Sequence, residues 1–223
     1  MTYKNILIFL FCLSVYILLP GCDSAGNKGK YLAKPNINNF AINNIVFFGN
    51  SLTAGYGLDS SEAYPALIQL KIDSFHLPYK VINAGVPGIT TSEGNSLFDA
   101  LLDHPVSVFT LELGGNDGLK GIAVPQISKN LQTIIDKVKK KYPSCKIILS
   151  GMQLPATLGV KYRADFKAIY PKLADSNKIY LVPFLLDGVG GIPGLNQSDG
   201  IHPNAQGDKI VAENVWKVLK SIL

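Results

Sequence analysis

Short apolar runs alternate with longer amphipathic stretches along most of the chain. Each run holds five to eight mostly apolar or β-branched residues between turn-forming residues, a pattern typical of buried strands. The predicted strands are residues 44–48, 80–84, 106–113, 146–150 and 179–184.

Helical patterns fill the stretches between these runs. Ser61 and Glu62 open the first, Thr90 with Glu93 forms a capping box for the second, and a regular stripe of apolar residues follows Pro125. The predicted helices are residues 61–72, 90–103, 162–176, which contains Pro171, and 205–223, together with the one that begins at Pro125. This alternation predicts an α/β fold in three layers, with a five-stranded parallel sheet between helices, and ligands bind such sheets at the carboxyl ends of the strands.

The first 21 residues read as a signal peptide. Lys4 precedes an apolar run, residues 6–19, that is too short to span a bilayer but suits an export signal. The run ends in Leu-Pro-Gly followed by Cys22, which resembles the lipobox of bacterial lipoproteins, although Pro20 departs from the residue usual there. We expect Cys22 to be lipidated; an uncleaved anchor and an ordinary cleaved signal are the alternatives.

A tether follows the predicted lipidation site. Residues 23–39 are rich in Gly, Asn and Lys and have no apolar periodicity. We therefore expect a signal peptide at 1–21, a lipidated Cys22 and tether at 22–39, and one globular domain at 40–223. The chain would be exported and held on a membrane through its lipid anchor, on the periplasmic or cell-surface side.

Charge and cysteine content exclude several classes of function. The 21 basic residues exceed the 16 acidic ones by five, but they are scattered and include only one arginine, Arg163, so we expect no nucleic-acid partner. Cys12, Cys22 and Cys145 are too far apart in sequence for a zinc knuckle or a redox pair, so we expect no metal site and no disulfide framework.

Chemically useful residues stand at the predicted carboxyl ends of four strands. Ser51 follows the first strand, Gly85 the second and Asn116 the third, while Asp199 and His202 come after the fifth. Each alone is as well explained by a turn or a helix cap. Their common position predicts one site at this edge of the sheet.

These motifs resemble those of the SGNH hydrolases, the GDSL esterase and lipase family, from about residue 44 to the end of the chain. The four motif residues of the family are matched by Ser51, Gly85, Asn116 and His202. The resemblance implies a flavodoxin-like fold and cofactor-free hydrolysis of small-molecule esters or thioesters through an acyl-serine. Asn50 stands where the family motif has aspartate, a position outside the catalytic residues.

The residue chemistry agrees with this resemblance. A serine hydroxyl needs a base, and of the three histidines His76 and His104 precede strands, which leaves His202. Asp199, three residues earlier, can hold the second imidazole nitrogen. The family's oxyanion hole would consist of the Ser51 and Gly85 amides and the Asn116 side chain.

The lack of other motifs in the sequence argues against several other enzyme classes. The segment around Ser51 lacks the second glycine of an α/β-hydrolase elbow, and phosphate-loop and dinucleotide motifs are missing. A catalytically silent lipoprotein that binds acyl chains or glycans remains an alternative.

Among esterases, the similarity favours the arylesterase, thioesterase and lysophospholipase branch, with short-to-medium acyl groups. A carbohydrate O-acetyl esterase is the second choice, although Trp216, the one tryptophan, falls in the last predicted helix. The expected acyl- or aryl-binding surface comes from the loops at 86–90 and 153–162, through Val86, Ile89, Leu154, Leu158, Val160 and Tyr162.

Overall fold

A computed structural model describes residues 43–101 and 104–223. The predicted signal peptide, Cys22 and the whole predicted tether lie outside these residues. The strands are β1 (Asn43–Gly49), β2 (Tyr79–Gly85), β3 (Val108–Glu112), β4 (Lys146–Ser150) and β5 (Tyr180–Val182). All neighbouring pairs are parallel, in the order β2-β1-β3-β4-β5, so the predicted five-stranded parallel sheet is confirmed.

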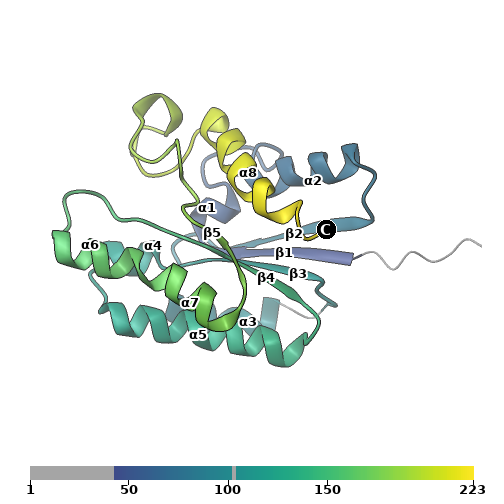
Figure 1. Cartoon of the computed structure of the whole chain (residues 1–223). Helices are drawn as coiled ribbons and strands as arrows, with labels where there is room; N and C mark the ends of the chain where they lie inside the picture. Colours follow the sequence, from purple (N-terminus) through teal and green to yellow (C-terminus); the bar gives the residue numbers. More distant parts are fainter. Residues whose placement is uncertain (1–42, 102–103) are drawn as a thin grey trace, which may run out of the picture. The chain divides into compact units, whose positions relative to one another are not determined.

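Helices cover both faces of this sheet. Helices α1 (Ser51–Ala54), α2 (Tyr64–Ser74) and α8 (Ala205–Leu219) lie on one face, and α3 (Thr91–Leu101), α5 (Val124–Lys141) and α7 (Ile169–Asn177) on the other (Figure 1). The remaining helices are α4 (Gly115–Leu119), α6 (Val160–Lys167) and the 3₁₀ turn η1 (Pro193–Leu195). The strand order is that of flavodoxin-like folds, with its switch point between β1 and β3.

The central strands are buried on both faces. Residues 45–48 of β1 are at most 2% exposed, and every residue of β3 is buried. A strand covered by helices on both sides has no solvent face, which explains why these runs are mostly apolar and do not alternate with exposed polar residues. Within the described residues, no helix combines the length and apolar character needed to cross a membrane.

The start of one predicted helix differs from the prediction because a local turn competes with it. Ser61 does not open a helix: its backbone N–H and hydroxyl donate to Asp59 at 2.9 and 2.6 Å, which makes a turn, and α2 begins at Tyr64. The capping box at Thr90 and Glu93 does form: the Thr90 N–H donates to the Glu93 carboxylate at 2.7 Å, and the Glu93 N–H donates to the Thr90 hydroxyl oxygen at 3.4 Å.

The predicted helix at 162–176 is two helices. Helix α6 ends at Lys167 and α7 begins at Ile169, which places Pro171 in the first turn of α7. Proline is tolerated there because an N–H in the first turn has no partner inside the helix. The last helix ends at Leu219 rather than at the chain end.

Candidate active site

The end of β1 turns sharply into α1 and presents Ser51. Asn50 caps α1, because its Oδ1 accepts a hydrogen bond from the Leu52 N–H at 3.0 Å. Ser51 is the first helical residue, so its own N–H has no partner within the helix and is free to face a ligand. The turn needs glycine at 49: a Cβ there would lie 2.1 Å from Thr53 Oγ1.

The loop after β5 carries Asp199 and His202. Asp199 Oδ1 accepts the backbone N–H groups of Ile201 at 2.9 Å and His202 at 3.0 Å, so the carboxylate closes a tight turn around Gly200, whose φ is +70°. The other oxygen, Oδ2, lies 2.6 Å from His202 Nδ1. The acid therefore orients the imidazole through both the main chain and the ring.

These two segments meet in one hydrogen-bond chain. His202 Nε2 lies 2.8 Å from Ser51 Oγ, although the residues are 151 positions apart in sequence. The Tyr56 ring packs on the imidazole with 4.9 Å between ring centroids. Hydrogen bonds from the His202 ring and main chain lower the pKa of Asp199 to about 2. The carboxylate is thus ionised at neutral pH and can stabilise an imidazolium that forms beside it.

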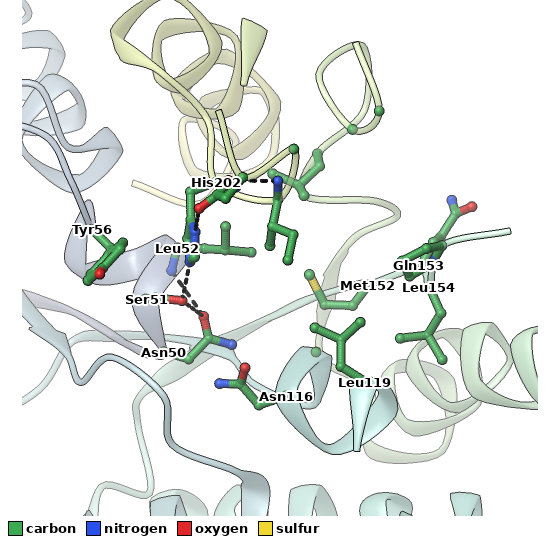
Figure 2. Close-up of a pocket in the computed structure, with 18 of the residues that line it drawn as sticks. Asn50, Ser51, Leu52, Tyr56, Asn116, Leu119, Met152, Gln153, Leu154 and His202 are labelled. Carbon is green, nitrogen blue, oxygen red and sulfur yellow. Dashed lines mark hydrogen bonds and ion pairs between the residues drawn. The ribbon is translucent and has the colours of Figure 1, made fainter. Parts of the chain in front are cut away.

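Asn116 lies in α4, which follows β3, so it stands across the switch point between β1 and β3 from Ser51. Its Nδ2 donates one hydrogen to the Ile89 carbonyl at 2.9 Å, which fixes the amide. An amide nitrogen carries two hydrogens, so one remains for a substrate in the cleft. Figure 2 shows Asn116 below Asn50 and Ser51.

The structure does not place Gly85 in this site, which corrects its predicted role. The Gly85 N–H donates to Asn83 Oδ1 at 2.9 Å, so it is not available to an oxyanion. A Cβ at Gly85 would lie 2.3 Å from the Ala54 nitrogen; the glycine is needed where β2 packs against α1.

Gly88 lines the cleft instead. It has φ +83° after Pro87, and the Ile89 N–H reaches back to the Val86 carbonyl at 3.5 Å. A Pro-Gly pair with positive φ at the glycine is the signature of a type II turn, a signal that sequence reasoning missed.

A cleft of about 810 Å³ opens beside the hydrogen-bond chain. Figure 2 shows Leu119, Met152 and Leu154 on one side of Ser51 and Tyr56 on the other. No lysine or arginine of the described ranges lines the cleft. Its larger aliphatic and aromatic side chains include Leu52, Leu119, Met152, Leu154, Phe184, Leu186 and Ile201.

The predicted acyl-binding residues are mostly elsewhere. Of the six, only Leu154 lines the cleft; Val160 is 79% exposed, and the Tyr162 hydroxyl donates to the Ile122 carbonyl. Half of the lining residues come from α4 and from the loop after β5. The two predicted loops do border the cleft, but through other residues: Pro87 and Gly88 from the first, and Gln153, Leu154, Pro155 and Ala156 from the second. Trp216 is buried in α8, where it stacks on Phe75.

Ser51, His202 and Asp199 form one hydrogen-bonded series at the switch point of a flavodoxin-like sheet. Such a triad defines a serine hydrolase of the acyl-transfer type. Residues 47–210 match the model of the GDSL-like Lipase/Acylhydrolase family. The chain belongs to this family and is a serine ester hydrolase.

Named relatives span nearly the whole described domain. The chain is 38% identical over 184 residues to "Esterase TesA" of Pseudomonas aeruginosa, covering 82% of this chain and 90% of that protein. It is 36% identical to "Thioesterase 1/protease 1/lysophospholipase L1" of Escherichia coli K12, covering 82% and 86%. Among solved structures, that of TesA superposes with a TM-score of 0.77 at 38% identity, covering 81% of this chain and 99% of the other.

Proposed function

We propose that this protein hydrolyses carboxylic esters or thioesters of short-to-medium acyl groups through an acyl-Ser51 intermediate. The observation that carries the proposal is the continuous hydrogen-bond chain from Asp199 through His202 to Ser51 Oγ, with distances of 2.6 and 2.8 Å. A serine hydroxyl becomes a competent nucleophile when a positioned base accepts its proton.

The reaction takes two steps. Ser51 Oγ attacks the acyl carbonyl while His202 takes its proton, and the imidazolium then protonates the leaving alcohol or thiol. Water then enters, gives a proton to His202 and attacks the acyl carbonyl. The bond from that carbon to Ser51 Oγ breaks, the imidazolium returns the proton to Ser51 Oγ, and the acid is released. Asp199 keeps the imidazole in the tautomer with hydrogen on Nδ1 through both steps.

The oxyanion would be stabilised by the Ser51 N–H, the Gly88 N–H and the free hydrogen of Asn116. Each belongs to the same mouth of the cleft as Ser51. Gly88 replaces Gly85 in this proposal because the Gly85 N–H is already bonded to Asn83.

The lining favours an uncharged acyl group as substrate. Apolar side chains from α4 and the loops after β4 and β5 border the cleft, while no lysine or arginine of the described residues lines it to bind a phosphate or carboxylate. The acyl chain would lie against Leu119, Met152 and Leu154, and the leaving group would point toward Tyr56. The names of the relatives, an esterase and a thioesterase with lysophospholipase activity, support the same substrate classes.

A fluorophosphonate probe tests the proposal, because it reacts covalently only with an activated serine. Wild type should be labelled and should hydrolyse nitrophenyl esters and acyl-thioesters, while Ser51→Ala should lose both with an unchanged circular dichroism spectrum. Labelling retained in Ser51→Ala would refute the assignment. Faster turnover of acetylated xylan than of any acyl ester would favour the carbohydrate esterase instead.

We also propose that the protein is exported and lipidated at Cys22. The support is the apolar run at residues 6–19, followed by Cys22 and a tether without apolar periodicity. Palmitate labelling of cells that express the full chain should give a labelled, membrane-bound product, and Cys22→Ser should lose label and anchoring together. Release of an unlabelled wild-type product would show an ordinary cleaved signal.

A further inference from the structure

A fully buried carboxylate lies directly beneath the Ser51 turn. Glu112, the last residue of β3, pairs in register with Gly49 and is 0% exposed. Its Oε2 accepts the Asn50 N–H at 3.1 Å and the Thr53 hydroxyl at 2.9 Å, and its Oε1 accepts the Asn50 side-chain amide at 2.9 Å. The mechanism proposed above does not use Glu112.

The hydrogens around Glu112 are arranged for an acceptor. The Thr53 hydroxyl has one hydrogen, which goes to Glu112, so the Tyr64 hydroxyl, 2.9 Å from Thr53, donates to Thr53 in turn. Three donors therefore converge on the carboxylate. An ionised glutamate accepts only, which matches this environment.

We propose that Glu112 is a positioning residue for Ser51, and that Asn50 lets the turn close on Glu112 without a proton shared between them. Asn50 connects Glu112 to the turn that carries Ser51. Its amide nitrogen donates to Glu112, while its Oδ1 accepts the N–H of Leu52, the residue after Ser51, and so caps α1. The direction of Ser51 Oγ toward His202 then depends on where Glu112 holds Asn50. This inference rests on the proposed role of Ser51 as nucleophile.

Asn50 stands where the family motif has aspartate, and the two side chains would interact with Glu112 in different ways. Aspartate there would bring a carboxylate oxygen to the place of the Asn50 amide nitrogen, which lies 2.9 Å from Glu112. Two carboxylates at that distance keep a proton between them, and removal of this proton at higher pH makes them repel.

Among the residues that the structure describes, no cationic side chain forms an ion pair with Glu112 that would offset a second charge. The titratable groups that its charge acts on are Tyr64 of α2 and Tyr170 of α7: burial raises the pKa of both, and the charge of Glu112 raises it further. Burial raises the pKa of Glu112 to about 7, although the hydrogen bonds from Asn50 and Thr53 lower it. Replacement of the Asn50 donor by an acid would raise the proton affinity of the pair further.

The first test is the pH profile of Asn50→Asp. The variant binds a proton more tightly when folded than when unfolded, so its stability is greatest at low pH and is lost as pH rises. Relative to wild type, kcat should fall by about tenfold between pH 5 and pH 9, equivalent to one pKa unit of coupling, with little change in KM. The difference in Tm should widen over the same range. Gln206→Glu, which adds the same charge at an exposed position of α8, should show neither trend.

The second test reverses the hydrogen-bond polarity. Glu112→Gln alone sets an amide donor against the Asn50 amide, so kcat should be reduced at every pH. In Asn50→Asp/Glu112→Gln, the glutamine amide can donate to the new carboxylate, while its oxygen accepts the N–H of residue 50 and the Thr53 hydroxyl. This double variant should recover kcat to within a few-fold of wild type and have a wild-type pH profile.

Three outcomes would overturn the proposal: a loss in Asn50→Asp that does not depend on pH, single variants that equal wild type, or a double variant no better than the worse single one. Lowered Tm with an unchanged kcat in the folded fraction would make Glu112 a purely structural residue. If wild type fails to hydrolyse any ester while the Tm trends hold, the proposed function fails and the pairing of residues 50 and 112 stands.

Discussion

The segment that carries Ser51 and the loop that carries His202 are held in different ways. Asn50 and Thr53, on either side of the nucleophile, are 3% and 0% exposed and bond to Glu112, which is 62 and 59 residues away in sequence. In the other segment, the Asp199 side chain is 39% exposed and bonds to residues two and three positions on. One segment is fixed by the sheet, and the other closes on itself.

This contrast indicates which partner is more mobile. Opening the Ser51 turn would break the hydrogen bonds between the buried Glu112 carboxylate and its three donors. The free-energy cost is high because Glu112 belongs to the central strand β3. Opening the His202 loop breaks mainly local hydrogen bonds in a glycine-containing turn, which is typical of segments that open at low free energy. Gln197 connects the loop to a distant segment, because its Nε2 donates to the Tyr56 carbonyl at 2.7 Å. The same Nε2 also donates within the loop, to the Pro203 carbonyl at 2.9 Å.

The largest effect should come from removing the base. His202→Ala should lower kcat by at least about 10⁴, because nothing else in the chain of hydrogen bonds can accept the Ser51 proton. His76→Asn is the matched control, since His76 is exposed, is far from Ser51 in the fold and has φ +52°, which asparagine tolerates. Steady-state hydrolysis of a nitrophenyl ester measures both. Near-wild-type turnover in His202→Ala would contradict the assignment.

Asn116→Ala should have the next largest effect. Its free amide hydrogen meets the substrate oxygen most strongly when that oxygen is charged, so kcat should fall by about 10² to 10³, or 2.7–4 kcal/mol, with little change in KM. Asn116→Asp should be as poor or poorer because it brings negative charge to the oxyanion. A raised KM at constant kcat would instead make Asn116 a substrate-binding residue, leaving the Ser51 and Gly88 amides as the oxyanion hole.

Gln197→Ala tests the loop side of the comparison. Loss of the two side-chain hydrogen bonds should let the loop move away from Tyr56, lowering kcat/KM about tenfold, or about 1.4 kcal/mol. Gln206→Ala, at an exposed position of α8, is the control. Hydrogen exchange of residues 197–204 should speed up in Gln197→Ala while exchange in β1 is unchanged. Equal acceleration in β1 and the loop would show that the two segments open together.

The sequence predicted the sheet and the Ser51, Asp199 and His202 positions because those signals are local. A buried strand reads as an apolar run, and Asp199 lies one turn before His202. The prediction that Gly85 belongs to the oxyanion hole was wrong because a glycine at a strand end serves close packing as readily as catalysis. Only the structure distinguishes the two uses, through the contact with Ala54 and the hydrogen bond to Asn83. Glu112 was missed because an acid inside a strand gives no signal of its own. Its role depends on the register that sets Gly49 opposite it.

The smallest effect on activity should come from Asp208→Asn, which tests the buried polar groups behind the nucleophile segment. Asp208 lies in α8 and is 2% exposed; its Oδ2 accepts the Tyr64 N–H at 3.0 Å, which serves α2 because Ala63 offers no capping side chain. Burial raises the pKa of Asp208 to about 7 from 3.8, although the Tyr64 hydrogen bond lowers it.

A carboxyl whose folded pKa is raised contributes most to stability below its unfolded pKa, and this contribution is lost as pH rises through 7. The asparagine oxygen can still accept from Tyr64 but does not titrate. Asp208→Asn should therefore match wild type or be slightly less stable at pH 4, and be more stable at pH 8 by about 1–3 kcal/mol, or roughly 3–10 °C in Tm. The titration of Glu112 is common to both proteins and cancels in the difference, so a Tm difference that stays constant from pH 4 to pH 8 would show that Asp208 remains ionised throughout. Turnover at pH 7 should change by less than about twofold, since the Ser51 turn is held by Glu112 rather than by α8.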